Sequence, residues 1–196
     1  MLMLRKINNM KILETERLIL RTWKEEDAID YFNINQDPKV IEFLRGPLTM
    51  EQVNDFIPAA NSHGDKYGYT LWAVELKENG DLIGFIGLNY TDWESHFTPA
   101  VEVGWRLGSQ YWGKGFATEG AKAALDYGFT RCGLKEIVSF TVPSNIRSIR
   151  VMEKIGLKRD THGGFAHPKL AVDHPLSQHI LYRLGRDDYL KENDHD

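Results

Sequence analysis

The feature that most constrains the fold of this chain is a glycine-rich segment at residues 108–120, Gly-Ser-Gln-Tyr-Trp-Gly-Lys-Gly-Phe-Ala-Thr-Glu-Gly. It follows an apolar, strand-like run at residues 100–107 and precedes a helix-like run that begins at Ala117. Glycine has an entropic cost that is justified where the backbone must turn unusually or approach another group closely. A strand, a glycine-rich turn and a helix together suit phosphate, because the first N–H groups of a helix have no intrahelical acceptor. The segment therefore predicts an anion site, to which Lys114 adds positive charge.

Two common phosphate-binding motifs fit this segment poorly. A P-loop requires serine or threonine directly after Gly-Lys, whereas Gly115 follows Lys114 here. A dinucleotide-binding motif requires Gly-x-Gly-x-x-Gly in the first βα unit. Here Thr118 occupies the third glycine position, and three predicted strands already precede this βα unit. The first interpretation fails and the second is weak.

Length and composition are those of an ordinary folded protein. With 196 residues, 42% of them hydrophobic and 27% charged, the chain can bury a sizeable core in one domain. The net charge of −4 argues against non-specific nucleic-acid binding, which requires a basic face. The single cysteine, Cys132, excludes an intrachain disulfide and fits a reducing compartment. The apolar start at residues 1–4 is too short for a secretory leader and no run approaches transmembrane length, so we expect a cytoplasmic protein.

Periodicity and turn residues predict a mixed α/β domain without internal repeats. Strand-like runs cover residues 15–23, 69–76, 81–89, 100–107, 136–142, 157–160 and 178–184. Helix-like runs cover residues 24–37, a stretch from residue 49, residues 117–131 and residues 145–155. Thr49 and Gln52 resemble a capping box, and Pro58 is expected to kink or end the helix that they begin. The expected organisation is a loose leader, one domain and a disordered tail, at residues 1–11, 12–190 and 191–196.

The glycine segment resembles the coenzyme A pyrophosphate signature of the GNAT N-acetyltransferase superfamily. Gln110-Tyr111-Trp112-Gly113-Lys114-Gly115 fits the pattern Gln/Arg-x-x-Gly-x-Gly/Ala. The strand at residues 101–107 precedes it as in that family, and residues 143–157 resemble the family's second cofactor motif. Residues 13–21, Leu-Glu-Thr-Glu-Arg-Leu-Ile-Leu-Arg, resemble the branch that acetylates ribosomal-protein N-termini. The resemblance extends over residues 12–184, nearly the whole chain.

This resemblance implies a mixed, mostly antiparallel sheet of about seven strands flanked by about four helices. The sheet would be splayed between its fourth and fifth strands, with acetyl-CoA in the gap. Backbone groups at residues 105–107 would pair with the pantetheine arm, and amides at residues 113–118 would hold the pyrophosphate. Asn145 and Ser148 would face the pantetheine or the thioester. The implied cofactor contacts are Trp105, Arg106, Leu107, Gln110, Gly113, Lys114, Gly115, Phe116, Ala117, Thr118, Asn145 and Ser148.

Two residues are candidates for the chemistry. Glu102 alternates with Val101 and Val103, so it faces the other side of its strand. The resemblance implies that Glu102 removes the proton of the incoming amine, usually through water, and a solvent-facing strand carboxylate is the alternative. Many family members have a tyrosine near the position of Met152 that protonates the leaving thiolate. Methionine cannot donate a proton, so this role is absent or belongs to Ser148, a water or another residue.

Other conspicuous residues favour structural roles. Four histidines lie in or beside a segment interrupted by prolines: His162, His167, His174 and His179. They form no tight ligand pair and have no cysteine partner, so we expect no metal site. We expect instead a loop that borders the acceptor site. Cys132 precedes Gly133 at a predicted helix end and is interpreted as a packing residue. Ser144 or Asn145 could simply cap a helix. Trp93 and Phe97, with His96, either shape the acceptor pocket or cover the sheet.

The sequence thus predicts an acyl-CoA-dependent N-acetyltransferase. Acetyl-CoA and a primary amine would bind together, and the neutral amine would attack the thioester directly. The acceptor is a protein N-terminus or, alternatively, a small amine such as an antibiotic, a polyamine or an amino acid. A non-catalytic acyl-CoA-binding regulatory module is the rival from another class, and Glu102, as a proton acceptor, favours the enzyme. No nucleic acid, membrane or metal is an expected partner.

Overall fold

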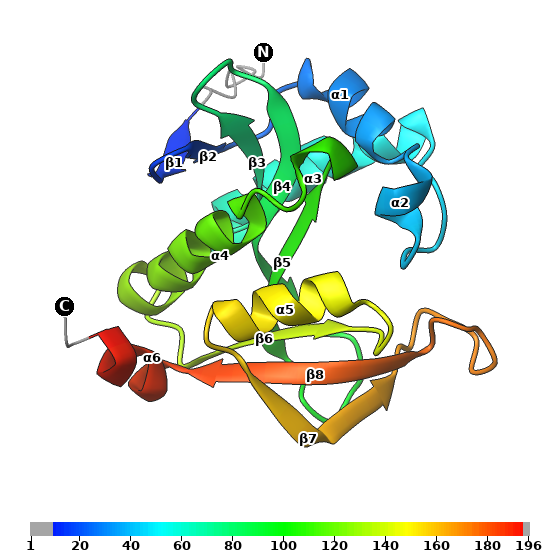
Figure 1. The fold of residues 1–196 in the computed structure, drawn as a ribbon, viewed down its shortest axis with the longest axis vertical. Helices are drawn as coiled ribbons and strands as arrows, with labels where there is room; N and C mark the ends of the chain where they lie inside the picture. The colour runs from blue at the N-terminus through cyan, green and yellow to red at the C-terminus, as the bar shows by residue number, and fades with distance from the viewer. Residues whose placement is uncertain (1–9, 194–196) are drawn as a thin grey trace, which may run out of the picture.

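One mixed sheet forms the centre of the protein in a computed structural model that describes residues 10–193 (Figure 1). The strand order is β1-β2-β3-β4-β5-β6-β8-β7. The strands are β1 (Lys11–Glu14), β2 (Leu18–Arg21), β3 (Leu71–Leu76), β4 (Leu82–Thr91), β5 (Ala100–Leu107), β6 (Glu136–Thr141), β7 (Lys158–Ala166) and β8 (Gln178–Gly185). The seven predicted strands are present, and the additional strand is β1, which pairs antiparallel with β2.

The sheet is antiparallel except at the place where it splits. β4 and β5 pair antiparallel along their length, from Gly84 and Leu107 to Thr91 and Ala100. β5 and β6 run parallel and, within the described chain, are paired at Glu102 and Val138. The C-terminal half of β5 is therefore not hydrogen-bonded to β6. This confirms the predicted splay, since β5 and β6 are the fourth and fifth strands that the sequence predicts.

Helices cover both faces of the sheet. They are α1 (Asp27–Ile34), α2 (Pro38–Ile41), α3 (Met50–Tyr67), α4 (Phe116–Asp126), α5 (Ile146–Lys154) and α6 (Arg186–Asn193). In Figure 1, α4 and α5 lie in front of the sheet and α3 lies behind it. The larger core cluster lies under α4 and includes Val103 and Leu125, and a second cluster under α1 and α3 includes Trp23, Tyr31 and Val53. No helix within residues 10–193 is long and apolar enough to cross a membrane.

The capping box is confirmed at the start of α3, and of the two outcomes predicted at Pro58, a kink or an end, the end does not occur. Thr49 Oγ1 accepts the N–H of Gln52, and Gln52 Oε1 accepts the N–H of Thr49. The helix continues through Pro58 to Tyr67. Pro58 is exposed, so its missing N–H weakens one turn on the solvent side. On the inner side Asn61 exchanges two hydrogen bonds with the backbone of Trp23, which holds the helix on the sheet.

The C-terminal part of the chain is more regular than the sequence predicts. The helix predicted at residues 117–131 is α4 up to Asp126 and then continues as one π-helical turn. The predicted disordered tail is wrong for residues 191–193, which belong to α6. Tyr189 of α6 stacks on Phe129 with ring centroids 4.8 Å apart. This contact joins distant segments, so no local sequence pattern predicts it. Residues 194–196 of the tail and 1–9 of the leader lie outside the described residues.

Candidate functional site

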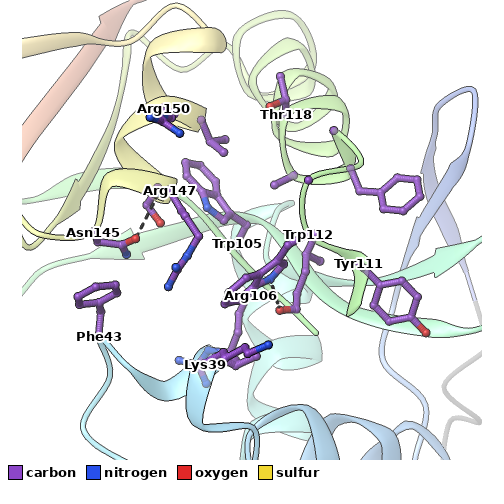
Figure 2. Close-up of a pocket in the computed structure, with 18 of the residues that line it drawn as sticks. Lys39, Phe43, Trp105, Arg106, Tyr111, Trp112, Thr118, Asn145, Arg147 and Arg150 are labelled. Atoms are coloured by element: carbon purple, nitrogen blue, oxygen red, sulfur yellow. Dashed lines mark hydrogen bonds between the residues drawn. The ribbon is translucent and has the colours of Figure 1, made fainter. Parts of the chain in front are cut away.

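A cavity of about 360 Å³ opens where β5 and β6 diverge (Figure 2). Its walls come from the end of β5, the glycine segment with the start of α4, one side of α5, and α2 with the residues after it. All of the predicted cofactor residues except Gln110 and Lys114 line this cavity. These residues are Trp105, Arg106, Leu107, Gly113, Gly115, Phe116, Ala117, Thr118, Asn145 and Ser148. The cavity thus brings together three segments that are distant in sequence, within residues 39–44, 105–118 and 145–154.

The glycine segment turns through two left-handed residues. Gly113 has a φ of +75° and Gly115 a φ of +86°, a region that other residues rarely adopt. Gly115 is the N-cap of α4, where no side chain accepts a hydrogen bond from the helix. Among the described backbone groups, none of the recorded hydrogen bonds uses the N–H groups of residues 113–115. The turn and the first turn of α4 therefore present amide donors at the positive end of a helix, which suits an anion.

Two predicted cofactor residues point elsewhere. Gln110 is exposed and borders a neighbouring acidic hollow that includes Asp81. The ammonium of Lys114 lies 5.9 Å from the ring centroid of Tyr111, and its backbone carbonyl accepts a hydrogen bond from Arg17 at 2.9 Å. The sequence motif identifies the turn correctly, but the direction of each side chain depends on the turn geometry, which the motif does not specify.

Asn145 begins α5 as its N-cap. Its Oδ1 accepts the N–H of Ser148 at 3.2 Å, and its Nδ2 donates to Thr141 Oγ1 at 3.1 Å. The simple capping role that the sequence allowed is therefore present. Ser148 lines the cavity one turn later, whereas Met152, one further turn along, is fully buried in the larger core cluster. Met152 is a packing residue here.

Arg147 crosses the cavity from α5, and sequence reasoning missed it. Its guanidinium lies 2.5 Å from a carboxylate oxygen of Glu42, 4.6 Å from the Trp112 ring centroid and 5.8 Å from that of Phe43. Figure 2 shows Arg147 and Arg150 on the same side of α5. Their spacing of three residues is a signal that sequence analysis could have used. Further positive charge in the lining comes from Lys39, Arg150 and Lys154.

Glu102 lies at the closed end of the split, where β5 and β6 still pair, and does not itself line the cavity. Val101 and Val103 are buried in the larger core cluster, so the Glu102 side chain faces the other side, as predicted. Gly104 is on the same face as Glu102, and a Cβ added there would stand 3.8 Å from Glu102 Oε1. Burial raises the pKa of Glu102 to about 8, and the charge of Lys169 opposes this rise. A carboxyl group with this pKa is suited to exchanging a proton near neutral pH.

Aromatic side chains cover the sheet beside Glu102. Val138, the parallel partner of Glu102, belongs to a cluster with Phe97 and Phe165. Trp93 packs against both phenylalanines, with ring centroids 5.4 and 5.6 Å away. The sequence left open whether Trp93 and Phe97 shape a pocket or cover the sheet, and in the structure both pack over the sheet on the face of Glu102.

Two of the histidines join this aromatic cover. The rings of His167 and His179 lie 5.1 Å apart. Burial, with the nearby charges of His179 and Lys169, lowers the pKa of His167 to about 4, so its ring is neutral near pH 7. Within residues 10–193, no group of three or more His, Cys, Asp or Glu side chains is arranged to hold a metal. Cys132 packs against the larger core cluster, and burial raises the pKa of its thiol.

Comparison with known proteins agrees with this geometry. The family model described as "Acetyltransferase (GNAT) domain" matches residues 17–158. The "Uncharacterized N-acetyltransferase p20" of Bacillus licheniformis is 33% identical over 153 residues, which are 77% of this chain and 84% of that protein. The FsC-acetyl coenzyme A-N(2)-transacetylase of Aspergillus fumigatus is 31% identical over 190 residues, which are 91% of this chain and 78% of that protein.

The similar proteins include the ribosomal-protein branch that residues 13–21 resemble. The ribosomal protein uS5-alanine N-acetyltransferase of Escherichia coli is 24% identical over 186 residues, 90% of this chain and 92% of that protein. The crystal structure of an acetyltransferase (GNAT family) from Bacillus anthracis matches with a TM-score of 0.73 and 27% identity. That match covers 89% of this chain and 98% of the solved chain, so the likeness extends over nearly the whole fold.

Proposed function

This chain belongs to the GNAT acetyltransferase family and is an acyl-CoA-dependent N-acetyltransferase, and from this premise we propose how it acts. It transfers an acetyl group from acetyl-CoA to a primary amine that is bound in the same complex. One observation carries the proposal. The cavity lies between the glycine turn and α5, where β5 and β6 diverge, and Glu102 is at the closed end of this split.

The chemistry of the cavity walls suits acetyl-CoA. The pyrophosphate is an anion, and the amide donors of residues 113–118 at the start of α4 are its proposed partners. The pantetheine arm is an extended chain with amide groups. The backbone of residues 105–107 is its proposed partner, because β6 diverges there and leaves one edge of β5 unpaired. Arg147, Arg150 and Lys154 place positive charge around the anionic ligand.

The proposed reaction takes place at the closed end of the split. The amine nitrogen forms a bond to the thioester carbon, and the bond from that carbon to sulfur then breaks. Glu102 accepts the proton of the amine, directly or through a water. A backbone N–H of β5 stabilises the oxyanion, and Ser148 donates a hydrogen bond to the departing thiolate. A thiol has a pKa near 8.5, so the thiolate needs less assistance than an alkoxide would.

The proposed acceptor is the α-amine of a peptide N-terminus. The pKa of Glu102 is about 8, and an α-amino group has a pKa of about 8, so a proton passes between them at little cost in free energy. A lysine-like amine with a pKa of about 10.4 matches less well. The similarity to the uS5-alanine N-acetyltransferase also supports this choice. A small molecule with an amine of low pKa is the second candidate, because the FsC transacetylase is the more similar relative at 31% identity.

The test is release of coenzyme A thiol from acetyl-CoA in the presence of three acceptor sets. These sets are peptides with free N-terminal amines, the same peptides with blocked N-termini and one internal lysine, and small amines of graded pKa. We expect thiol release with free N-terminal peptides and little with blocked ones. Turnover confined to small amines would replace the first candidate by the second. Absence of both coenzyme A binding and thiol release would refute the proposal.

A further inference from the structure

The proposed reaction makes no use of Thr15 and Arg17, which belong to the conspicuous motif at residues 13–21. Both residues lie in the turn between β1 and β2. Nearly one hundred residues later in the chain come the glycine turn and the first turn of α4. The structure brings these two regions into contact, so the N-terminal hairpin lies directly behind the proposed phosphate site.

Arg17 contacts Lys114 of the glycine turn and Phe116 at the start of α4, and it lies beside Gly115 between them. Its Nη1 donates to the backbone carbonyl of Lys114 at 2.9 Å. A Cβ added to Gly115 would stand 3.4 Å from Arg17 Nη2. The guanidinium also lies over the ring of Phe116, 4.6 Å from its centroid. Gly115 and Phe116 line the cavity but Arg17 does not, so Arg17 lies behind the turn.

The same guanidinium pairs with Glu119 in the first turn of α4. Arg17 Nε donates to one carboxylate oxygen at 2.7 Å, and Nη2 lies 2.6 Å from it. The other oxygen accepts the Arg17 backbone N–H at 2.9 Å and the Thr15 hydroxyl at 2.5 Å. Burial acts to raise the pKa of Glu119, but these donors outweigh it and hold the pKa below its ordinary value. Glu119 is therefore ionised and fully occupied by the hairpin.

An ionised carboxylate in this position is a problem for an anion site. The start of α4 attracts phosphate through its dipole, and an unpaired negative charge within the same turn would oppose that attraction. Arg17 supplies a compensating positive charge at contact distance from Glu119. A lysine could supply the charge, but the guanidinium fork binds Glu119 through two of its nitrogens and the Lys114 carbonyl through the third.

We propose that Arg17 is a positioning residue for the phosphate end of acetyl-CoA. It holds the Lys114 carbonyl behind the turn and neutralises Glu119, so that amide donors and no uncompensated carboxylate face the pyrophosphate. Arg17 itself does not touch the cofactor. This inference rests on the proposed function, because it requires that acetyl-CoA binds at the glycine turn.

The experiment compares two ligands, coenzyme A and pantetheine, of which pantetheine lacks the phosphates. Calorimetry is carried out on the wild type, Arg17→Gln and the double variant Arg17→Gln with Glu119→Gln. We expect Arg17→Gln to weaken coenzyme A binding about tenfold and pantetheine binding less than about twofold. The double variant is expected to recover about threefold of the loss, because the unpaired carboxylate is gone. In turnover, KM for acetyl-CoA rises and kcat is retained.

Lys77→Gln is the matched control. Lys77 is a cation that contacts the same hairpin, through the Glu14 carboxylate at 2.7 Å and the Thr15 carbonyl, away from residues 114–119. We expect the Lys77→Gln variant to bind coenzyme A and pantetheine with the affinities of the wild type. Arg17→Lys is the second variant if Arg17→Gln fails to fold by circular dichroism. It keeps the charge without the fork, and we expect a loss of about threefold that is again confined to coenzyme A.

Each outcome has a defined meaning. Equal weakening of coenzyme A and pantetheine would show a general structural role and would overturn the inference about Arg17. Unchanged coenzyme A affinity in folded Arg17→Gln, or in Arg17→Lys where that variant is used instead, would overturn it as well. A wild type that fails to bind coenzyme A would refute the proposed function itself, and this result is visible before any variant is compared.

Discussion

The proposed phosphate end of the cavity is built from backbone groups, whereas the closed end is built from side chains. At the phosphate end, Gly113 and Gly115 expose amides, and the Lys114 side chain points away. At the closed end, Glu102 stands beside Gly104 on a face that aromatic side chains cover. A backbone site tolerates changes of most side chains but not changes of its glycines. A side-chain site has the opposite sensitivity.

The two ends also differ in how many segments supply them. The amide donors come from one contiguous turn, residues 113–118. The surroundings of Glu102 come from β4, β5, β6 and the connection after β7 that carries Lys169. The proposed amide contacts to phosphate are therefore local in sequence, whereas the surroundings of Glu102 depend on long-range packing. Variants at each end test whether this division holds.

Glu102→Gln is expected to have the largest effect. The change keeps size and polarity, so acetyl-CoA binding is retained, and kcat/KM falls about 10²–10⁴-fold because a positioned base is lost. Steady-state kinetics with a reactive amine, together with calorimetry for coenzyme A, measures both quantities. A loss of less than a few-fold across the accessible pH range would mean that Glu102 is an ordinary strand residue and that the base lies elsewhere.

The pH dependence sharpens this prediction. The pKa of Glu102 is raised to about 8, so the carboxylate that accepts the proton forms as the pH rises toward 8. With an acceptor whose amine pKa is well above 8, wild-type kcat/KM is expected to increase up to about pH 8 and then level off. The variant depends on free amine from solution, which continues to increase above pH 8. The deficit of Glu102→Gln is therefore expected to be constant below pH 8 and to shrink above it.

Gly115→Val tests the backbone end and is expected to weaken coenzyme A binding about 10²-fold. Valine at a φ of +86° is strained, and its Cβ would stand 3.4 Å from Arg17 Nη2. Lys114→Ala is the matched control in the same turn, and we expect less than about threefold from it, because the amides carry the contact. Calorimetry measures both, with circular dichroism to establish that each variant is native. If Lys114→Ala were the more damaging change, the site would be a side-chain site after all.

Ser148→Ala tests the junction between the two ends. Ser148 lines the cavity, and its backbone N–H is already bonded to Asn145 Oδ1, so the variant removes the hydroxyl while the helix cap persists. If the hydroxyl bonds the departing thiolate, kcat is expected to fall about tenfold with coenzyme A affinity nearly unchanged. Equal kcat in wild type and variant would remove Ser148 from the chemistry.

The sequence predicts the fold well because most of its signals are local. Alternation marks the strands, and the capping residues Thr49 and Gln52 mark the start of α3. The failures are at places where distant contacts override a local signal. α3 does not end at Pro58, because Asn61 anchors the helix to Trp23. Residues 191–193 are helical because α6 packs through Tyr189 on Phe129.

The same distinction explains what the sequence missed in the site. The glycine turn and the start of α5 were predicted because each is a contiguous motif. Arg147 contacts Glu42, which is 105 positions away in the chain, and Trp112, which is 35 positions away. Arg17 contacts Glu119, which is 102 positions away. Sequence spacing does not identify such pairs, because their contact depends on the divergence of β5 and β6 and on the pairing of the N-terminal hairpin with the sheet.

Met152→Leu is expected to have the smallest effect, and the reason lies in which side of α5 the residue occupies. Met152 is fully buried in the larger core cluster, whereas Ser148 lines the cavity. Leucine nearly preserves the volume of methionine, so we expect kcat within about twofold of the wild type and a small change in the free energy of unfolding, below about 1.5 kcal/mol. Steady-state kinetics and urea unfolding measure the two quantities. A large loss of kcat in a stable Met152→Leu protein would show that this position contributes to the chemistry without donating a proton. The side-chain end of the site would then extend along α5 to Met152.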